Sequence, residues 1–144
     1  MSFHFNMQKV LDYREQLEEE AKVRLGKAES DFRAALERYD SIQKELADAR
    51  SQGTGKLMQN GERWLLDQFI KGLDSDLKEA ALQVRMLKQM TEEARKVLAA
   101  RAMDRKMLEK LKERQKADHY KIEQKQEQNF NDEIATIRYK APAF

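Results

Sequence analysis

The chain has 144 residues, 38% of them charged, with a formal net charge of +2, one proline, five glycines and no cysteine. Disulfides and thiolate metal sites are therefore excluded, and scarce turn residues argue against a compact core of many elements. The apolar runs are too short to span a membrane and the N-terminus lacks a secretory signal pattern, so a cytoplasmic location is expected. Good helix formers dominate, which predicts long helices packed lengthwise.

The first predicted helix covers about residues 5–50. Its apolar positions alternate in steps of four and three, the spacing of a coiled-coil seam. Upstream, Met7, Val10 and Leu17 keep a related register, and the two steps of four around Ala21 predict a stutter that locally unwinds the supercoil. The main seam positions are Ala21, Leu25, Ala28, Phe32, Ala35, Tyr39, Ile42, Leu46 and Ala49.

A hairpin tip is predicted at residues 51–61, which contain three of the five glycines. Glycines of this kind end helices by adopting left-handed backbone conformations. A second helix is predicted over about residues 62–138, followed by a frayed tail at 139–144, so that the chain forms one coiled-coil domain. Its seam again alternates four and three, through Leu66, Ile70, Leu73, Leu77, Ala80, Val84, Leu87, Thr91, Ala94 and Leu98.

The turn predicts an all-α fold, an antiparallel two-helix coiled-coil hairpin. A helix over residues 7–50 is about 65 Å long, and one over residues 62–138 is about 115 Å. The first helix is then expected to run out opposite Arg105. Arg101 and Arg105 stand in seam positions, so the apolar seam falters at the same place. Residues beyond about 107 are expected to form a long C-terminal helical overhang without a partner from the chain itself.

Four stretches of the chain, taken in order, form a recognisable set. They are Phe3-His4-Phe5 with Val10-Leu11-Asp12-Tyr13-Arg14, Arg63-Trp64 through Gln68-Phe69-Ile70 and Leu73, Leu108-Glu109-Lys110-Leu111-Lys112-Glu113-Arg114, and Glu127-Gln128 with Asp132-Glu133-Ile134-Ala135. Together they resemble the FliJ family, the small coiled-coil stalk of the bacterial flagellar type III export ATPase.

This resemblance implies a fold like the central γ stalk of rotary ATPases. It implies that the protein sits in the hexameric export ATPase ring FliI and contacts the export-gate protein FlhA. Export chaperones and the ATPase regulator FliH are further partners that it implies. The location implied is peripheral, at the inner face of the cell membrane, where the export apparatus lies.

No catalytic, cofactor or metal site is expected. Residues 53–56, Gly-Thr-Gly-Lys, resemble part of a phosphate-binding loop, but Leu57 follows the lysine where a serine or threonine would hold magnesium, and no strand precedes it. His4 and His119 are the only histidines and lie on different segments. A two-helix rod offers no pocket in which they could converge with carboxylates. The chain is therefore not expected to be an enzyme.

The start of the second helix carries apolar residues on more than one side. A two-stranded seam needs only one line of them, so Trp64, Leu65 and Phe69 are surplus and are expected to be exposed. Exposed apolar clusters with aromatic anchors mark interfaces. We therefore predict that these residues and Leu73 form a docking face for the export gate. The alternative is that Leu57 and Met58 fold over them.

Residues 85–125 hold thirteen Lys/Arg against seven Asp/Glu, an excess of six positive charges. Such a stretch could bind an acidic protein surface, bind phosphate backbones or remain a solvated face. Nucleic acid is not expected as a partner, because Tyr120 is the one aromatic residue and acids are mixed with the bases. The residues predicted to contact the ATPase ring are Arg101, Arg105, Lys112 and Arg114, with Phe130 and Ile134 of an amphipathic strip near the C-terminus.

The function expected from the sequence is that of a non-enzymatic stalk and adaptor of flagellar protein export. It would dock into the ATPase ring and onto the export gate to support delivery of substrates and chaperones. Two alternatives are a self-associating structural coiled coil, with both seams paired between chains, and a basic nucleic-acid-binding rod.

Overall fold

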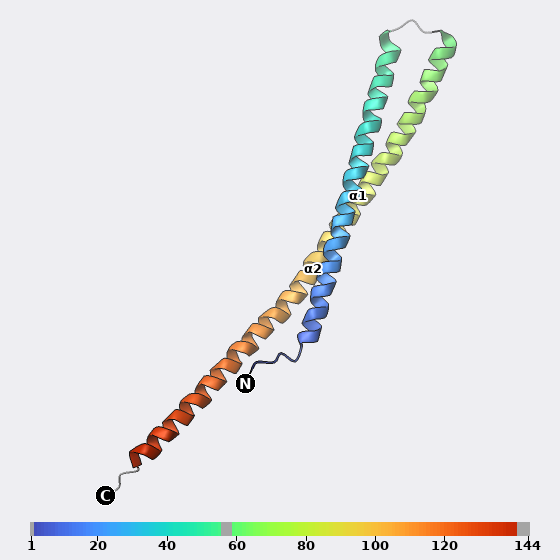
Figure 1. The fold of residues 1–144 in the computed structure, drawn as a ribbon. Helices are drawn as coiled ribbons and strands as arrows, with labels where there is room; N and C mark the ends of the chain where they lie inside the picture. The colour runs from blue at the N-terminus through green and yellow to red at the C-terminus, as the bar shows by residue number, and fades with distance from the viewer. Residues whose placement is uncertain (1, 56–58, 141–144) are drawn as a thin grey trace. The chain divides into compact units, whose positions relative to one another are not determined.

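The computed structural model describes residues 2–55 and 59–140. Two long helices make up nearly all of this part of the chain, α1 (Gln8–Gly55, 48 residues) and α2 (Asn60–Lys140, 81 residues) (Figure 1). The chain divides into two compact units. The hairpin unit is Glu19–Ala100, and the terminal unit combines Met1–Glu18 with Arg101–Phe144.

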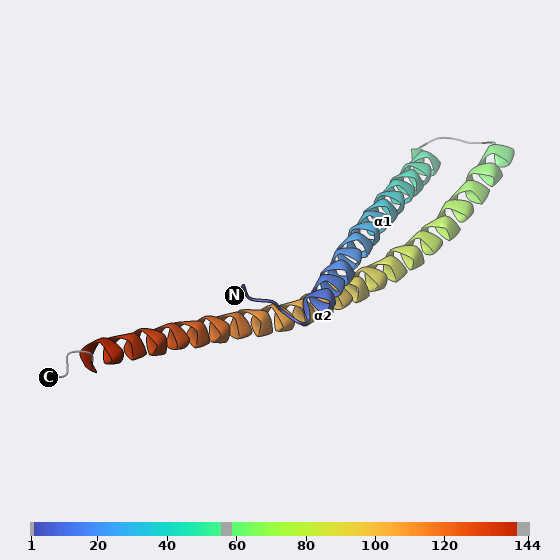
Figure 2. The ribbon, with the colours of Figure 1, turned by 60° about the horizontal axis from the view of Figure 1, so that its bottom comes forward.

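In the hairpin unit the two helices run antiparallel (Figure 2) and contact each other through residues such as Leu46 and Leu73. Arg38 Nη1 donates to Gln83 Oε1 at 3.3 Å. Further from the turn, Arg95 Nη2 lies 3.5 Å from Glu29 Oε1. Residue numbers thus fall in α1 as they rise in α2, as an antiparallel pair requires. The predicted all-α helical hairpin is confirmed, and the open rod that pairs its seams only between chains does not fit these intrachain contacts.

The core of the hairpin unit follows the predicted seam. Leu46, Ala49 and Leu73 are buried together. Every predicted seam residue of α2 from Leu66 to Leu98 is buried or half-buried, and so is every one of α1 from Ala21 to Ala49. The half-buried residues packed against this cluster are Ile42, Leu66, Ile70 and Leu77.

The polar member of the α2 seam is accommodated by its own helix. Thr91 is buried, and its hydroxyl donates to the Leu87 carbonyl at 2.8 Å. This bond to the preceding turn satisfies the hydroxyl group, so that threonine can occupy a position otherwise held by apolar side chains.

The end of α1 differs from the prediction. The helix continues to Gly55 rather than ending near residue 50, and no described glycine has a positive φ. Gly53 is helical, and a Cβ added to it would lie 3.4 Å from Leu66 Cδ2. A Cβ at this position would therefore meet Leu66 at an ordinary contact distance, and the prediction that this glycine ends the helix is wrong. Asn60 begins α2.

In the terminal unit a short N-terminal arm and the first turns of α1 pack on α2. Phe5, Leu11 and Leu108 are buried together, with Phe3 and Leu111 against them. Phe3 also contacts the ring of His119, with ring centroids 5.7 Å apart. The arm therefore pairs with α2 well beyond residue 107, where the overhang was predicted to begin. Past His119 most of the described apolar residues are exposed.

The seam upstream of Ala21 also differs from the prediction. Met7 and Val10 are exposed, whereas Leu11 and Glu18 are buried. The buried or half-buried positions 11, 14, 18 and 21 step by three, four and three, which continues the regular heptad pattern. Leu17 is half-buried as well, so the predicted stutter through Leu17, Ala21 and Leu25 stays a prediction. Glu18, which the apolar pattern does not include, is buried next to Leu17.

Neither helix, over the residues described, contains an apolar stretch of the length that crossing a bilayer requires.

Candidate protein-docking surfaces

The first turns of α2 present a surface that we call the hairpin-end face, formed by Trp64, Leu65 and Phe69. Their exposed fractions are 61%, 63% and 53%, as the surplus of apolar residues predicted. Leu73, predicted to belong to the same face, is only 6% exposed and lies in the core with Leu46 and Ala49. Leu73 is thus a seam residue. The alternative that Leu57 and Met58 cover the face lies outside the described residues.

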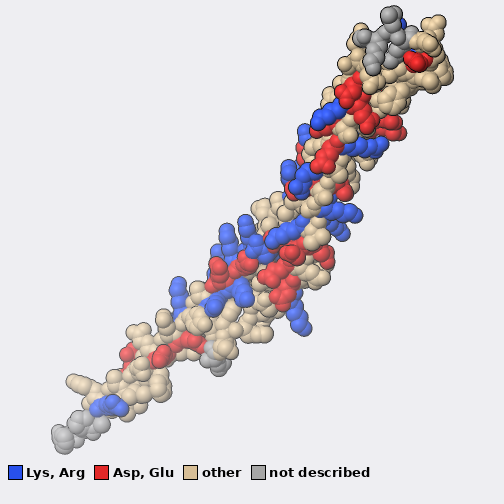
Figure 3. All heavy atoms as spheres, turned by 45° about the horizontal axis from the view of Figure 1, so that its top comes forward, with Lys and Arg blue, Asp and Glu red and all other residues tan. Residues whose placement is uncertain are grey.

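The geometry of a heptad explains why these side chains point outward. Leu65 and Phe69 each precede a seam residue by one position, and one residue turns the chain by about 100° around the helix axis. They therefore lie beside the seam on one side of α2, one helical turn apart. On the face that Figure 3 shows, much of the described surface near the hairpin end is uncharged, whereas acids and bases are interspersed along the middle of the molecule. Exposed aromatic clusters of this kind are typical of protein interfaces.

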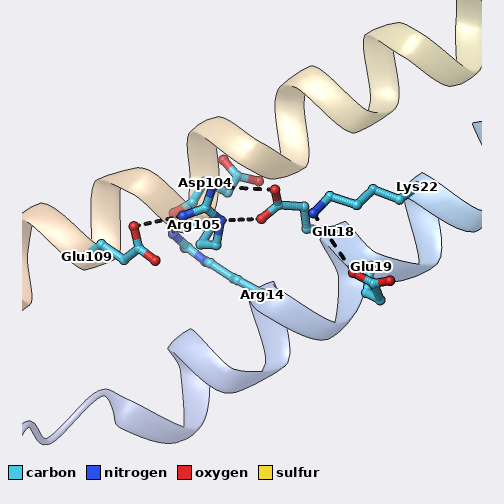
Figure 4. Close-up of polar contacts among 7 residues, drawn as sticks. All are labelled: Arg14, Glu18, Glu19, Lys22, Asp104, Arg105 and Glu109. Atoms are coloured by element: carbon cyan, nitrogen blue, oxygen red, sulfur yellow. Dashed lines mark hydrogen bonds and ion pairs between the residues drawn. The ribbon is translucent and has the colours of Figure 1, made fainter.

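A polar cluster in the terminal unit accounts for Arg105 in the seam (Figure 4). Arg14 Nη1 donates to the Asp104 carbonyl at 2.8 Å. Arg105 binds the Glu18 carboxylate through Nε and, at 3.4 Å, through Nη2, and its Nη1 donates to Glu109 at 2.7 Å. The hydrogen bonds with Glu18 and then with Glu109 raise the pKa of Arg105 above its ordinary value. Glu18, 7% exposed, is buried because this fork satisfies both its oxygens.

This cluster makes a testable contribution to folding. Glu18→Gln is expected to lower the melting temperature followed by circular dichroism, because it breaks a charge-assisted bond at a buried position. Glu19→Gln is the matched control, since Glu19 is exposed in its ion pair with Lys22. The exchange of charges in Glu18→Arg with Arg105→Glu is expected to regain part of the loss. Equal melting temperatures for Glu18→Gln and Glu19→Gln would contradict a structural role for the pair.

The predicted ring-contact residues lie in the terminal unit but do not form one patch. Arg105 is engaged with two carboxylates, and Lys112 Nζ donates to Gln8 Oε1 at 2.7 Å. Arg101 is half-buried, and Arg114 is exposed. Of the four basic residues, Arg114 is therefore the most accessible to a partner, whereas Arg105 and Lys112 hold the chain together.

The C-terminal strip of α2 is amphipathic and largely uncovered. Phe130 and Ile137 are exposed and Ile134 is half-buried. A shallow groove lies beside them, lined by Asn129, Asp132, Glu133, Thr136 and Ile137. An apolar strip without packing partners in the described part of its own chain can bind another protein.

The described residues contain no group of three or more His, Asp or Glu side chains that could hold a metal ion. His119 Nε2 lies 3.3 Å from Glu123 Oε1, one helical turn away, and its ring contacts Phe3. These contacts give His119 a packing role.

Sequence reasoning missed two features. Glu18 was overlooked because a charged residue does not register in an apolar pattern. The exposed residues Leu82, Met86 and Met90 were also passed over, although their spacing of four is visible in the sequence. Looking for a second apolar line beside the seam would have found them.

A comparison with protein-family sequence models found a match: the family described as flagellar FliJ protein, over residues 3–143 of the chain. No curated protein matches the chain.

Proposed function

Because the chain belongs to the FliJ family of flagellar proteins, as the sequence resemblance indicated, and thus has a role related to flagellar export, we propose that it is a stalk and adaptor of the export apparatus. The FliJ family is not a known enzyme family. In the proposed role the chain docks into the ring of the export ATPase FliI and onto the gate protein FlhA, and it catalyses no reaction itself. It thereby supports delivery of substrates and chaperones, with FliH as a further partner, in the cytoplasm at the inner face of the membrane.

The observation that carries this proposal is the hairpin-end face. Three large apolar side chains, two of them aromatic, are more than half exposed at one end of a hairpin whose own seam is already filled. Leaving them in water forgoes the stabilisation that burial would give, about 1.5–3 kcal/mol for a side chain such as Leu or Phe. A partner surface that covers them gains this free energy on binding. We propose that this partner is the export gate.

The second contact that we propose, with the ATPase ring, uses the terminal unit. Phe130, Ile134 and Ile137 supply its apolar part, and Arg114 with Arg101 supplies the charge. Arg105 and Lys112, which the sequence also suggested, act by holding the N-terminal arm and α1 to α2 within this unit. Charged contacts at the rim of an interface mainly set the rate and salt dependence of association.

Arg114→Glu is expected to weaken binding to the purified export ATPase by about 3- to 10-fold, because it replaces attraction by repulsion. The affinity of the unmodified chain is expected to fall as salt rises, since salt screens exposed charges. Lys44→Glu, which reverses a charge in the same way at an exposed position of the hairpin unit, is the control and should leave the affinity unchanged. Affinity that is equal at low and high salt, or competition by generic duplex DNA, would count against this contact.

A further inference from the structure

A second line of exposed apolar side chains runs along α2 in the hairpin unit. We call it the methionine stripe, and it consists of Leu82, Met86, Met90 and Val97, whose exposed fractions are 57%, 65%, 55% and 45%. The first three are four residues apart, so they stack on one side of the helix. Val97 follows two turns after Met90. The stripe lies outside the seam and outside the hairpin-end face.

The stripe and the seam occupy neighbouring sides of the same helix. Met86, Met90 and Val97 each precede a seam residue by one position, namely Leu87, Thr91 and Leu98. α2 therefore carries two apolar lines, one packed on α1 and one open. A helix in a two-stranded pair needs only one such line, and a second is typical of a helix that packs against two neighbours.

A groove runs beside the stripe. It has a volume of about 310 Å³ and is lined by Asp31, Ala34, Ala35, Arg38, Gln83 and Leu87. Gln83 is three residues before Met86 and seven before Met90, so these side chains share one face of α2. Because Ala34 and Ala35 have small side chains, the side of the groove that α1 forms is shallow. The backbone of another helix can therefore approach closely.

The charges beside the groove indicate the kind of helix that fits. Because Arg38 pairs with Gln83 and Glu29 with Arg95, α1 residues 24–38 lie opposite α2 residues 83–97. In these two segments the charged residues on the groove side or beside the stripe comprise five bases and three acids. They are Arg24, Lys27, Arg38, Arg85 and Lys96, and Asp31, Glu92 and Glu93.

Most of these bases are available to a partner. Arg24, Lys27, Arg85 and Lys96 are exposed, and none of them forms an ion pair within the part of the chain that the structure describes. A second copy of the chain would bring the same positive excess against itself, which is unfavourable. A partner with acidic edges would be attracted.

We propose that the methionine stripe and this groove bind one amphipathic helix of a partner protein, with an apolar side flanked by Asp and Glu. The partner helix lies along α2 over residues 82–97, a length of about 22 Å, and forms a third helix beside the two helices of the hairpin. Methionine suits such a surface because its flexible side chain adapts to differently shaped apolar partners. This interaction is independent of the hairpin-end face and of the ring contact.

The probe for this site is a pair of labelled synthetic helices of about 20 residues. Both carry leucines at four- and three-residue spacing, and the flanking positions hold Glu in one peptide and Lys in its twin. Fluorescence anisotropy with the full chain measures both affinities. The acidic peptide is expected to bind at least about 10-fold more tightly than the basic twin.

Variants of the chain locate the binding surface. Met86→Gln with Met90→Gln is expected to lower the affinity for the acidic peptide by about 10-fold or more. Helicity should be kept, because glutamine forms helices as well as methionine does. Val23→Gln, at an exposed apolar position of α1, is the control and should leave the affinity unchanged. Arg24→Glu with Lys27→Glu is expected to lower the affinity for the acidic peptide and to raise the affinity for the basic twin.

Several results would overturn the proposal. They are failure of the acidic peptide to bind, equal affinity for the two peptides, or equal losses in Val23→Gln and the methionine variant. Sedimentation of the chain alone, which measures its oligomeric state, could give one more contradicting result. A dimer that dissociates in the methionine variant would show that a second copy occupies the stripe. A further comparison tests whether this site is distinct from the export-gate contact. If variants of the hairpin-end face lose binding to the export gate but still bind the acidic peptide, the two sites are distinct, and the proposal stands whether or not the gate contact is right.

Discussion

The chain with Trp64→Ala and Phe69→Ala is expected to bind the purified export gate about 1,000-fold more weakly than the unmodified chain, since each aromatic anchor of an interface contributes roughly 2 kcal/mol and every 1.4 kcal/mol is tenfold in affinity. Both side chains are more than half exposed and lie at the same end of the hairpin unit. Alanine is the best helix former, so α2 should remain intact. Isothermal titration calorimetry measures the affinity, and far-ultraviolet circular dichroism checks helicity.

Phe130→Ala supplies the matched control for this experiment. Phe130 is also an exposed aromatic residue of α2, but it belongs to the terminal unit. Its loss should leave gate binding unchanged and should weaken binding to the ATPase ring instead. The hairpin-end face would be excluded as the gate contact if the double variant kept its affinity, or if Phe130→Ala lost as much.

Leu73→Ala is expected to lower the free energy of unfolding by about 2–4 kcal/mol, because it leaves a cavity among packed side chains. Leu73 is 6% exposed between Leu46 and Ala49. The same substitution at exposed Leu65 should change the free energy of unfolding by no more than about 0.5 kcal/mol. Urea denaturation followed by circular dichroism measures both.

This comparison separates folding from docking at neighbouring positions of one helix. Leu65→Ala should weaken gate binding with little effect on stability, whereas Leu73→Ala should act mainly on stability. Similar unfolding free energies for the two variants would show that Leu73 is not a core residue, and would return it to the docking face that the sequence suggested.

The seam of the hairpin unit was predictable because it depends on spacing and residue type alone. Steps of four and three place Leu46, Ala49, Leu73 and Ala80 on one line of each helix, and burying that line is the main gain available to so polar a chain. The exposure of Trp64, Leu65 and Phe69 followed from the same pattern by elimination. Their partner is not contained in the pattern, so their role in gate binding stays a prediction.

The register of the first turns of α1 was not predictable from apolar spacing. Glu18 is buried because Arg105 lies beside it, 87 positions away along the chain. A charged residue with no such neighbour would have remained in water, and the seam would have passed through other residues. The N-terminal arm shows the same dependence. Phe3 and Phe5 lengthen the paired region because Leu108 and His119 receive them.

By itself the sequence determined that the chain forms two long helices, where the apolar seam of the hairpin unit lies, and the family to which the chain belongs, since helix propensity and heptad spacing are local properties. Only the tertiary structure decided how positions that break the pattern are used. Gly53 lies within α1 next to Leu66 instead of ending the helix, Glu18 pairs with Arg105, and Leu73 belongs to the core. The physical reason is that burial of a polar, small or surplus residue depends on the atoms facing it, and these come from a distant part of the chain.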